Sequence, residues 1–283
     1  MSTHTQANTP GPTPFTLPRK PHYVTLAADC DFFALFQKIE RRFDTCYMLE
    51  SLGEDSHMAR HSIIGFDPEY TLYANGNTLS IENRNGDANH YPSDNPYELL
   101  RSLIPQNIIS RKYAGGLSGY LGYDAMQYFE PSLTLKASDD FDTFRFGLYK
   151  DGLILDKMTG EVTYFYYDNS RYAFLQTLID ADDEPAGPLH ITALGDTMSK
   201  AEHAEAVAKV KQDIIDGKVF QCEVGFKKRF RIQGDTLALY DQLRTINPSP
   251  QMYYVKFGEQ KLIGASPELL FRLRQGEMET FPL

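Results

Sequence analysis

A carboxylate directly after a Ser-Pro corner is the first residue whose position suggests chemistry. Glu268 follows Ser266 and Pro267, between a strand-like run and a second apolar run. A carboxylic acid acts as a general acid when burial or neighbouring carboxylates help it to keep its proton. A glutamate in the first turn of a helix can also simply favour the start of that helix. The residues around Glu268 allow both interpretations.

A second candidate lies in the alternating stretch KVFQCEVGF, residues 218–226. As a strand, this stretch would place apolar side chains on one face and Gln221, Glu223 and Gly225 on the other. Such a strand is usually half exposed, but its polar face can also form the wall of a polar cavity. Gln221 is therefore a candidate for a position inside a site.

Histidine and glycine spacings exclude other kinds of site. His57 and His61 stand four residues apart, but no HExxH glutamate accompanies them and the stretch lacks apolar periodicity. We expect a loop with two solvated imidazoles. The glycines of residues 115–122 do not follow dinucleotide or P-loop spacing, which argues against a phosphate loop.

The composition is that of an acidic globular protein. Of the 283 residues, 42% are hydrophobic and 13% aromatic, and the formal net charge is -10. The acidic balance argues against a nucleic-acid partner. No apolar run reaches the roughly 18 residues of a membrane helix, so we expect no membrane partner. Three widely spaced cysteines, Cys30, Cys46 and Cys222, form no zinc pattern and favour a reduced, cytoplasmic setting.

Candidate N-caps mark the starts of four predicted helices. Asp31 precedes an apolar periodic run, and Asp94 precedes a shorter one with an early proline. Ser199 and Glu202 form a capping-box pattern at the start of the most strongly predicted helix. Asp235 precedes the fourth helix.

Between these helices the sequence predicts strands. Asn/Gly turns join strands over residues 62–91, and glycines among aromatics at 115–130 predict a strand with a close backbone approach. Residues 144–167 read as hairpins with turns at Asp151–Gly152 and Thr159–Gly160.

Later turns at Gly258 and Gly276 predict two more hairpins. Strands that alternate with a few helices predict an α+β class with mostly antiparallel β-sheet layers.

Several longer motifs together resemble the anthranilate synthase component I family of chorismate-utilising enzymes. They run from about Phe15 to Leu283 and include YMLES, ARHSIIGFDP, GGLSGYLGYDAMQYFE, VFQCEVGFKKRF, INPSPQMYYVKFGEQKLIGASPELLFRL and ETFPL. Each motif alone is weak, but the combination is specific. The resemblance implies the chorismate-utilising enzyme fold, incomplete here because the family's chains are longer.

The resemblance implies a lyase reaction of tryptophan biosynthesis, in which chorismate and ammonia give anthranilate and pyruvate. A glutamine amidotransferase subunit would release the ammonia from glutamine, so a hetero-oligomer is expected. Mg²⁺ would hold the substrate carboxylate, and its ligands are expected beyond Leu283. Tryptophan is expected as the feedback inhibitor.

The same resemblance implies roles for individual residues. Glu268 would be the general acid that protonates the leaving ring hydroxyl. Gln221 stands where relatives that add water carry a lysine base, and a glutamine, which cannot take a proton, fits ammonia as the nucleophile. The implied tryptophan pocket comprises five residues: Glu50, Ser51, Pro250, Gln251 and Met252.

Four of these motif positions need a qualification from the residues themselves. Met252 could equally be ordinary core, and Gln251 replaces an aromatic residue that is usual in the family. Glu223 and Gly225 depart from the usual motif, and we have no physical account of that change.

The expected organisation has four parts. They are a mobile tail at 1–14, an effector-binding domain at 15–180, a linker at 181–197 and the start of a truncated chorismate-binding catalytic domain at 198–283. The linker follows from the acidic, Pro/Gly-containing stretch DADDEPAGP. Because the family's catalytic histidine and metal ligands lie beyond this range, we expect the chain to be inactive by itself.

Two alternatives stay open at this point. Aminodeoxychorismate synthase component I shares the fold and the ammonia chemistry, although the Asn-Pro-Ser-Pro-X-Met and Phe-Gln motifs favour anthranilate synthase. A non-catalytic tryptophan-binding module would fit if the length of the chain were natural.

Overall fold

The computed structural model describes residues 11–26, 30–52, 60–110, 113–274 and 276–280. His57 of the predicted histidine loop and most of the predicted tail lie outside these ranges. His61 does not lie in a loop but begins strand β3 (His61–Phe66). None of the helices within the described ranges is long and apolar enough to cross a membrane.

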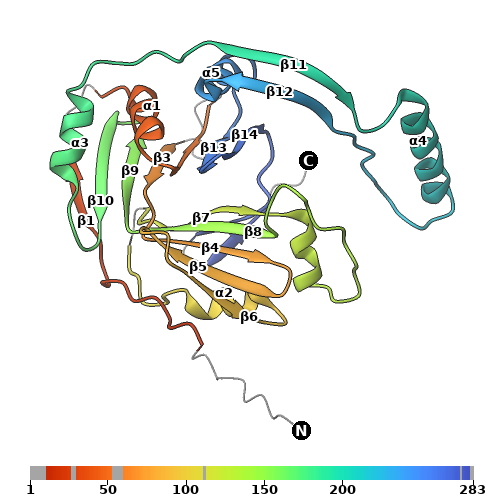
Figure 1. The fold of residues 1–283 in the computed structure, drawn as a ribbon, viewed down its shortest axis with the longest axis horizontal. Coiled ribbons are helices and arrows are strands. Elements are labelled where there is room, and N and C mark those ends of the chain that lie inside the picture. The colour runs from red at the N-terminus through yellow and green to blue at the C-terminus, as the bar shows by residue number, and fades with distance from the viewer. Residues whose placement is uncertain (1–10, 27–29, 53–59, 111–112, 275, 281–283) are drawn as a thin grey trace, which may run out of the picture. The chain divides into compact units, whose positions relative to one another are not determined.

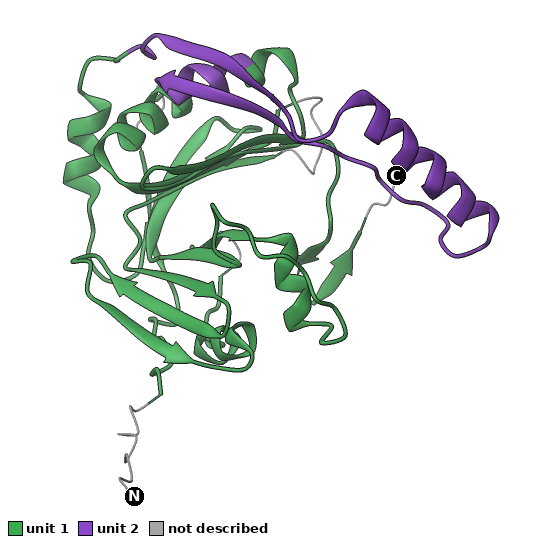
Figure 2. Ribbon diagram, turned by 45° about the vertical axis from the view of Figure 1, so that its right-hand side comes forward, with its two compact units in different colours: residues 1–184, 243–283 green, residues 185–242 purple. Residues whose placement is uncertain are grey.

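The chain divides into two compact units (Figure 2). Unit 1 comprises Met1–Glu184 and Leu243–Leu283, and unit 2 comprises Pro185–Gln242. The first boundary falls within the predicted linker 181–197, but that range is not a plain linker because β11 (Leu189–Asp196) lies in it. The second boundary falls inside helix α5 (Thr236–Ile246).

Unit 1 contains an antiparallel seven-stranded sheet (Figure 1). Its strands, in spatial order, are β1 (His22–Thr25), β10 (Glu161–Tyr166), β9 (Asp151–Asp156), β3, β2 (Thr45–Glu50), β13 (Gln251–Phe257) and β14 (Gln260–Ser266). The pairing of β13 with β2 joins the late part of the chain to the early part. The expected α+β class with mostly antiparallel sheet is confirmed.

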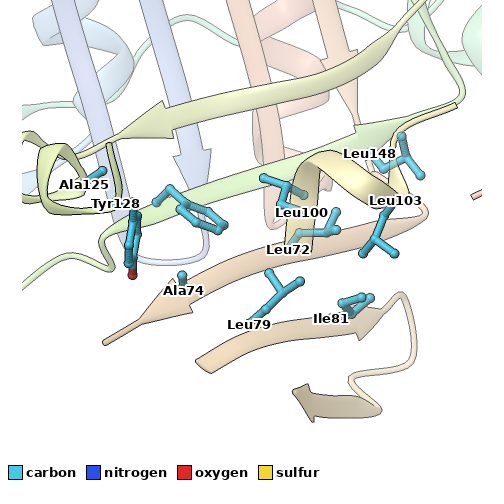
Figure 3. Packing of buried hydrophobic residues seen from close by; sticks show 10 residues of the cluster. Leu72, Ala74, Leu79, Ile81, Leu100, Leu103, Ala125, Tyr128 and Leu148 are labelled. Atoms are coloured by element: carbon cyan, nitrogen blue, oxygen red, sulfur yellow. The ribbon is translucent and has the colours of Figure 1, made fainter. Parts of the chain in front are cut away.

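A five-stranded sheet is the second layer of unit 1. Its spatial order is β6 (Ala88–Pro92), β5 (Thr78–Asn83), β4 (Tyr70–Asn75), β8 (Phe144–Tyr149) and β7 (Gly116–Leu121). Helix α2 (Pro96–Leu103) places Leu100 and Leu103 over Leu72 and Leu79 of this sheet, where all four are buried (Figure 3).

The predicted turn at Asp151–Gly152 is wrong. Those residues begin β9 of the seven-stranded sheet, whereas β8, which ends at Tyr149, belongs to the five-stranded sheet. The chain therefore passes from one sheet to the other at Lys150 instead of folding back. The predicted turn at Thr159–Gly160 is confirmed, with Gly160 at a φ of +72°.

Helix starts follow local capping chemistry. The Asp31 carboxylate accepts hydrogen bonds from the Phe33 and Ala34 amides at the start of α1 (Phe32–Arg42), as predicted. The cap of α2 is Asn95 and not Asp94, because the Asn95 Oδ1 atom accepts the Glu98 amide hydrogen bond. A 3₁₀ helix (Tyr123–Tyr128) and α3 (Tyr172–Ile179) complete the helices of unit 1 that are described in full.

Unit 2 consists of β11 paired with β12 (Lys228–Gly234), helix α4 (Lys200–Ile215) and the first part of α5. The capping box of Ser199 and Glu202 is confirmed, and the Asp235 carboxylate caps α5 at the Leu237 amide.

The predicted strand at 218–226 is wrong. The segment has no strand geometry, and the Phe220 side chain is fully exposed. The β11–β12 ladder ends at the Asp196–Lys228 pair, so pairing in unit 2 stops short of this segment.

The last described strands are β15 (Arg272–Arg274) and β16 (Glu277–Glu279), which form the hairpin predicted around Gly276. The turn between β13 and β14 also lies at Gly258 as predicted, with a φ of +59°.

Candidate functional site

The end of β2 and the turn before β13 lie together in unit 1. Glu50 is the register partner of Met252 in the β2–β13 ladder, so the turn 247–250 closes beside the residues that follow Glu50. Met252 is buried, and Pro250 and Gln251 are partly buried. The structure therefore brings together the five residues expected to form a tryptophan pocket. Their ligand remains a prediction.

Direct hydrogen bonds tie the two segments to each other. The buried Ser51 hydroxyl donates to the carbonyl oxygen of Pro250 at 2.6 Å, and the Leu52 amide donates to the carbonyl of Ser249 at 2.8 Å. The Lys157 ammonium group donates to the Ser51 carbonyl at 2.6 Å. Ser51 is thus fixed through both its side chain and its backbone.

Glu50 is held by an arginine that the sequence did not single out. The Arg244 Nε and Nη2 atoms lie 2.7 and 3.3 Å from the two carboxylate oxygens of Glu50. The Glu50 side chain is only 3% exposed, and the Arg244 guanidinium lies 4.0 Å from the ring centroid of Phe33. From sequence alone, Arg244 is an ordinary cation in the last turn of a helix, where it favours the helix dipole.

Glu268 lies in unit 1, in the connection between β14 and β15. Its side chain is exposed, and its amide donates to the Ser266 hydroxyl at 3.3 Å. No helix begins within residues 267–271, so the interpretation of Glu268 as a helix-start residue is wrong. The second Ser-Pro corner instead makes a local bend that places an exposed carboxylate after a strand.

Gln221 lies in the irregular segment of unit 2, and its side chain is exposed. The two predicted catalytic residues thus belong to different compact units. Within the described ranges, no group of three or more His, Cys, Asp or Glu side chains could hold a metal ion. The described residues therefore do not form a magnesium site by themselves.

A buried tyrosine cluster lies beside the strand that leads to Glu50. The Tyr47 and Tyr113 hydroxyls share a short hydrogen bond, and the Tyr47 ring packs edge-on against Tyr149. Burial raises the pKa of Tyr113 to about 12, although its hydrogen bond with Tyr47 lowers it. Burial likewise raises the pKa of Tyr47 well above its ordinary value. These hydroxyls stay neutral and act as hydrogen-bond donors and acceptors, a role that the sequence did not reveal.

Comparisons with known proteins identify the relatives of the chain. The profile of the chorismate binding enzyme family matches residues 26–283. Anthranilate synthase component 1 of Leptospira biflexa is 42% identical over 274 residues, which cover 94% of this chain and 58% of that protein. The same component of Methanothermobacter marburgensis is 36% identical over 253 residues, 89% of this chain and 54% of that protein.

A solved structure has a similar fold. The crystal structure of anthranilate synthase component I from Streptococcus pneumoniae TIGR4 aligns with a TM-score of 0.60 at 23% identity, covering 81% of this chain and 55% of that one. The chain thus spans little more than half the length of these relatives. Since the family profile covers nearly the whole chain, the chain belongs to the chorismate binding enzyme family.

Proposed function

We propose that this chain provides the first part of an anthranilate synthase large subunit, which converts chorismate and ammonia to anthranilate, pyruvate and water. The observation that carries the proposal is the 42% identity with anthranilate synthase component 1 of Leptospira biflexa across 94% of the chain. The enzyme would be a lyase of tryptophan biosynthesis and would work in the cytoplasm.

In this proposal Glu268 gives its proton to the ring hydroxyl as that hydroxyl leaves, because hydroxide is a poor leaving group. Gln221 takes no proton, which leaves ammonia as the nucleophile. A general acid needs surroundings that keep its proton in place, but the Glu268 side chain is exposed. The Gln221 side chain, which would face the nucleophile, is exposed as well. We therefore expect little or no activity from residues 1–283 alone.

The remaining requirements follow from the same family membership. Ammonia would come from a glutamine amidotransferase subunit, so the working enzyme is a hetero-oligomer. Mg²⁺, when bound, would neutralise the substrate carboxylate. Its ligands are expected outside the residues described here, since those residues offer no fitting group.

We also propose that tryptophan binds at the cluster of Glu50, Ser51, Pro250, Gln251 and Met252 and inhibits the enzyme. What supports this pocket is the direct contact of its two segments, which the Ser51–Pro250 hydrogen bond holds together. A buried methionine beside polar groups suits an indole ring. The effector-binding domain proposed at 15–180 would then also use residues 250–252 of the later segment, 198–283.

A chimera tests the catalytic proposal. Residues 1–283 are continued with the part of the Leptospira biflexa relative that this chain does not cover, and the product from chorismate, ammonium and Mg²⁺ is separated and identified. We expect anthranilate from the chimera, none from residues 1–283 alone, and a loss of about 100-fold or more in kcat for Glu268→Gln.

Glu259→Gln, an exposed change in the β13–β14 turn, is the matched control and should leave kcat unchanged. Aminodeoxychorismate as the product would replace the proposed reaction with the related one. Full turnover by the Glu268→Gln chimera would remove Glu268 from the mechanism. A folded chimera that binds tryptophan but turns over no chorismate would favour a non-catalytic module.

A further inference from the structure

Both ends of the turn 247–250 are held by the same residue, Glu50. On the far side of the turn, Met252 pairs with Glu50 through the β2–β13 ladder. On the near side, the Arg244 guanidinium donates two hydrogen bonds to the Glu50 carboxylate. The Glu50 backbone therefore holds the end of the turn at Met252, and its carboxylate holds the end at Arg244.

The Arg244–Glu50 pair has the features of a specific contact. The guanidinium meets the carboxylate with two hydrogen bonds, and its face lies over the Phe33 ring at 4.0 Å. Because the Glu50 side chain is almost fully buried, water could not readily replace the two hydrogen bonds that Arg244 donates to it. A lysine could supply the charge but not the planar fork or the stacking.

Arg244 also occupies a particular place in helix α5. It lies in the last turn of the helix, and the boundary between the two compact units falls just before it, between Gln242 and Leu243. One continuous helix thus runs from unit 2 to the residue that holds the turn. The backbone of α5 therefore connects unit 2 covalently to the residue that contacts Glu50.

We propose that Arg244 is a positioning residue that acts through Glu50 to hold the turn 247–250 against Ser51. It thereby links occupancy of this pocket to helix α5. The second part rests on the proposed tryptophan pocket, whereas the first part concerns the ligand-free protein. A cation that merely complements the dipole of α5 would be replaced by lysine without effect, so the fork geometry gives the proposal a distinct test.

Hydrogen exchange of the ligand-free chain tests the first part. The Leu52 amide, which donates to the Ser249 carbonyl, and the Asn247 amide, which donates to the Leu243 carbonyl, report on the held turn. In Arg244→Gln both amides should exchange at least about tenfold faster. The amides of β4 and β5 should keep their wild-type rates. Arg244→Lys should give intermediate rates.

A matched control separates this role from that of any helical arginine. Arg101 also lies in the last turn of a helix and pairs with Glu98 at 3.5 Å, but both side chains are exposed. Arg101→Gln should leave the Leu52 and Asn247 amides unchanged. Wild-type exchange in Arg244→Gln, or full rescue by Arg244→Lys, would overturn the positioning role. The double variant Glu50→Gln/Arg244→Gln should be little worse than either single variant.

Calorimetry with L-tryptophan tests the link to the pocket. We expect the dissociation constant to rise about tenfold or more in Arg244→Gln and to stay unchanged in Arg101→Gln. Unchanged affinity in Arg244→Gln would overturn the link. If the wild-type chain binds no tryptophan, the proposed pocket fails and the link with it, while the exchange rates still decide whether Arg244 positions the turn.

Discussion

The Ser51 hydroxyl donates a 2.6 Å hydrogen bond to the carbonyl oxygen of Pro250, although 199 residues separate them in the chain. The bond joins the end of β2 to the turn before β13. The β2–β13 ladder already places these two segments side by side. Ser51 is buried, so water could not readily replace the Pro250 carbonyl as the acceptor of its hydrogen bond. This contact connects the stability of unit 1 to the proposed regulatory pocket.

Removal of this hydroxyl should weaken both the fold and the pocket. Ser51→Ala is expected to lower the free energy of unfolding by about 1 kcal/mol, the usual net value of one hydrogen bond. Ser51→Phe should overfill the buried position and remove tryptophan inhibition in the active chimera while its uninhibited rate persists.

Urea denaturation and inhibition curves measure the two effects of the Ser51 changes. Ser102→Ala is the matched control, since that hydroxyl also donates to a carbonyl, of Leu99, but is exposed. Unchanged tryptophan inhibition in Ser51→Phe would contradict the pocket.

Arg171 should be a major stabilising residue of unit 1. Its guanidinium donates to both carboxylate oxygens of Asp151 at 2.7 and 2.6 Å and to Asp67 at 2.7 Å. It also lies 4.2 Å from the ring centroid of Phe66. Arg171→Ala leaves the buried Asp151 carboxylate without this partner, so we expect a loss of about 3 kcal/mol in the free energy of unfolding.

The comparison that isolates burial is Arg60→Ala. Arg60 also makes a two-nitrogen contact with a carboxylate, that of Asp156, but at the exposed surface. Chemical denaturation of both variants should show a much smaller loss for Arg60→Ala. Equal losses would mean that burial of the Arg171 cluster adds nothing.

Glu40 should make stability depend on pH in the acid range. Burial raises the pKa of this carboxyl, but the hydrogen bond from Lys261, the positive charges of Lys256 and Lys261 and the hydrogen bond from Tyr254 together bring it below its ordinary value of 4.5. Below that value the unfolded chain binds a proton that the folded chain does not. The stabilisation is therefore complete above about pH 4.5 and is lost as pH falls through the folded pKa.

Glu40→Gln should lower stability at pH 7 and flatten the loss between about pH 5 and pH 3. Thermal unfolding across that pH range measures the slope. The exposed Glu98→Gln change serves as the control and should retain the wild-type slope. An unaltered slope in Glu40→Gln would assign the acid sensitivity to other carboxylates.

Gly119 should not tolerate a side chain. It lies in β7, where a Cβ atom would overlap the carbonyl oxygen of Arg145 and come within 2.8 Å of the Phe146 Cα atom on β8. This is the close backbone approach that the glycines among aromatics predicted. Gly119→Ala is expected to lower the unfolding free energy by about 2 kcal/mol, as in an overpacked core.

Gly11→Ala is a suitable control for that measurement, because a Cβ atom there would meet nothing within 4 Å. Differential scanning calorimetry of the two variants should show a lower melting temperature for Gly119→Ala alone. A wild-type melting temperature for Gly119→Ala would show that β7 and β8 can separate without penalty.

The sequence predicted the features that depend on neighbouring residues. Asp31 caps α1, Ser199 and Glu202 form the capping box of α4, and Gly258 and Gly276 make their turns as expected. The capping side chains accept hydrogen bonds from amides a few residues away, and the glycines adopt the positive φ that a turn requires. Both effects involve only neighbouring residues, so the local sequence is sufficient to predict them. The α+β class followed from the same local patterns.

Which strands pair and which residues are buried depends on contacts between distant parts of the chain. Lys150 carries the chain from one sheet to the other, although the local pattern around Asp151 resembles a hairpin turn. The alternating residues around Gln221 form no strand, because alternation supplies a face but not a partner for the backbone.

The candidate site shows the same division. Sequence motifs indicated Glu50, Ser51 and the turn before Met252, but nothing local indicated that Arg244 would hold Glu50. That contact exists because β13 pairs with β2, a choice set by the burial of whole sheet faces across most of the chain. Sequence motifs identified the family and most of the helix caps and turns, whereas the folded sheet determined which distant side chains meet.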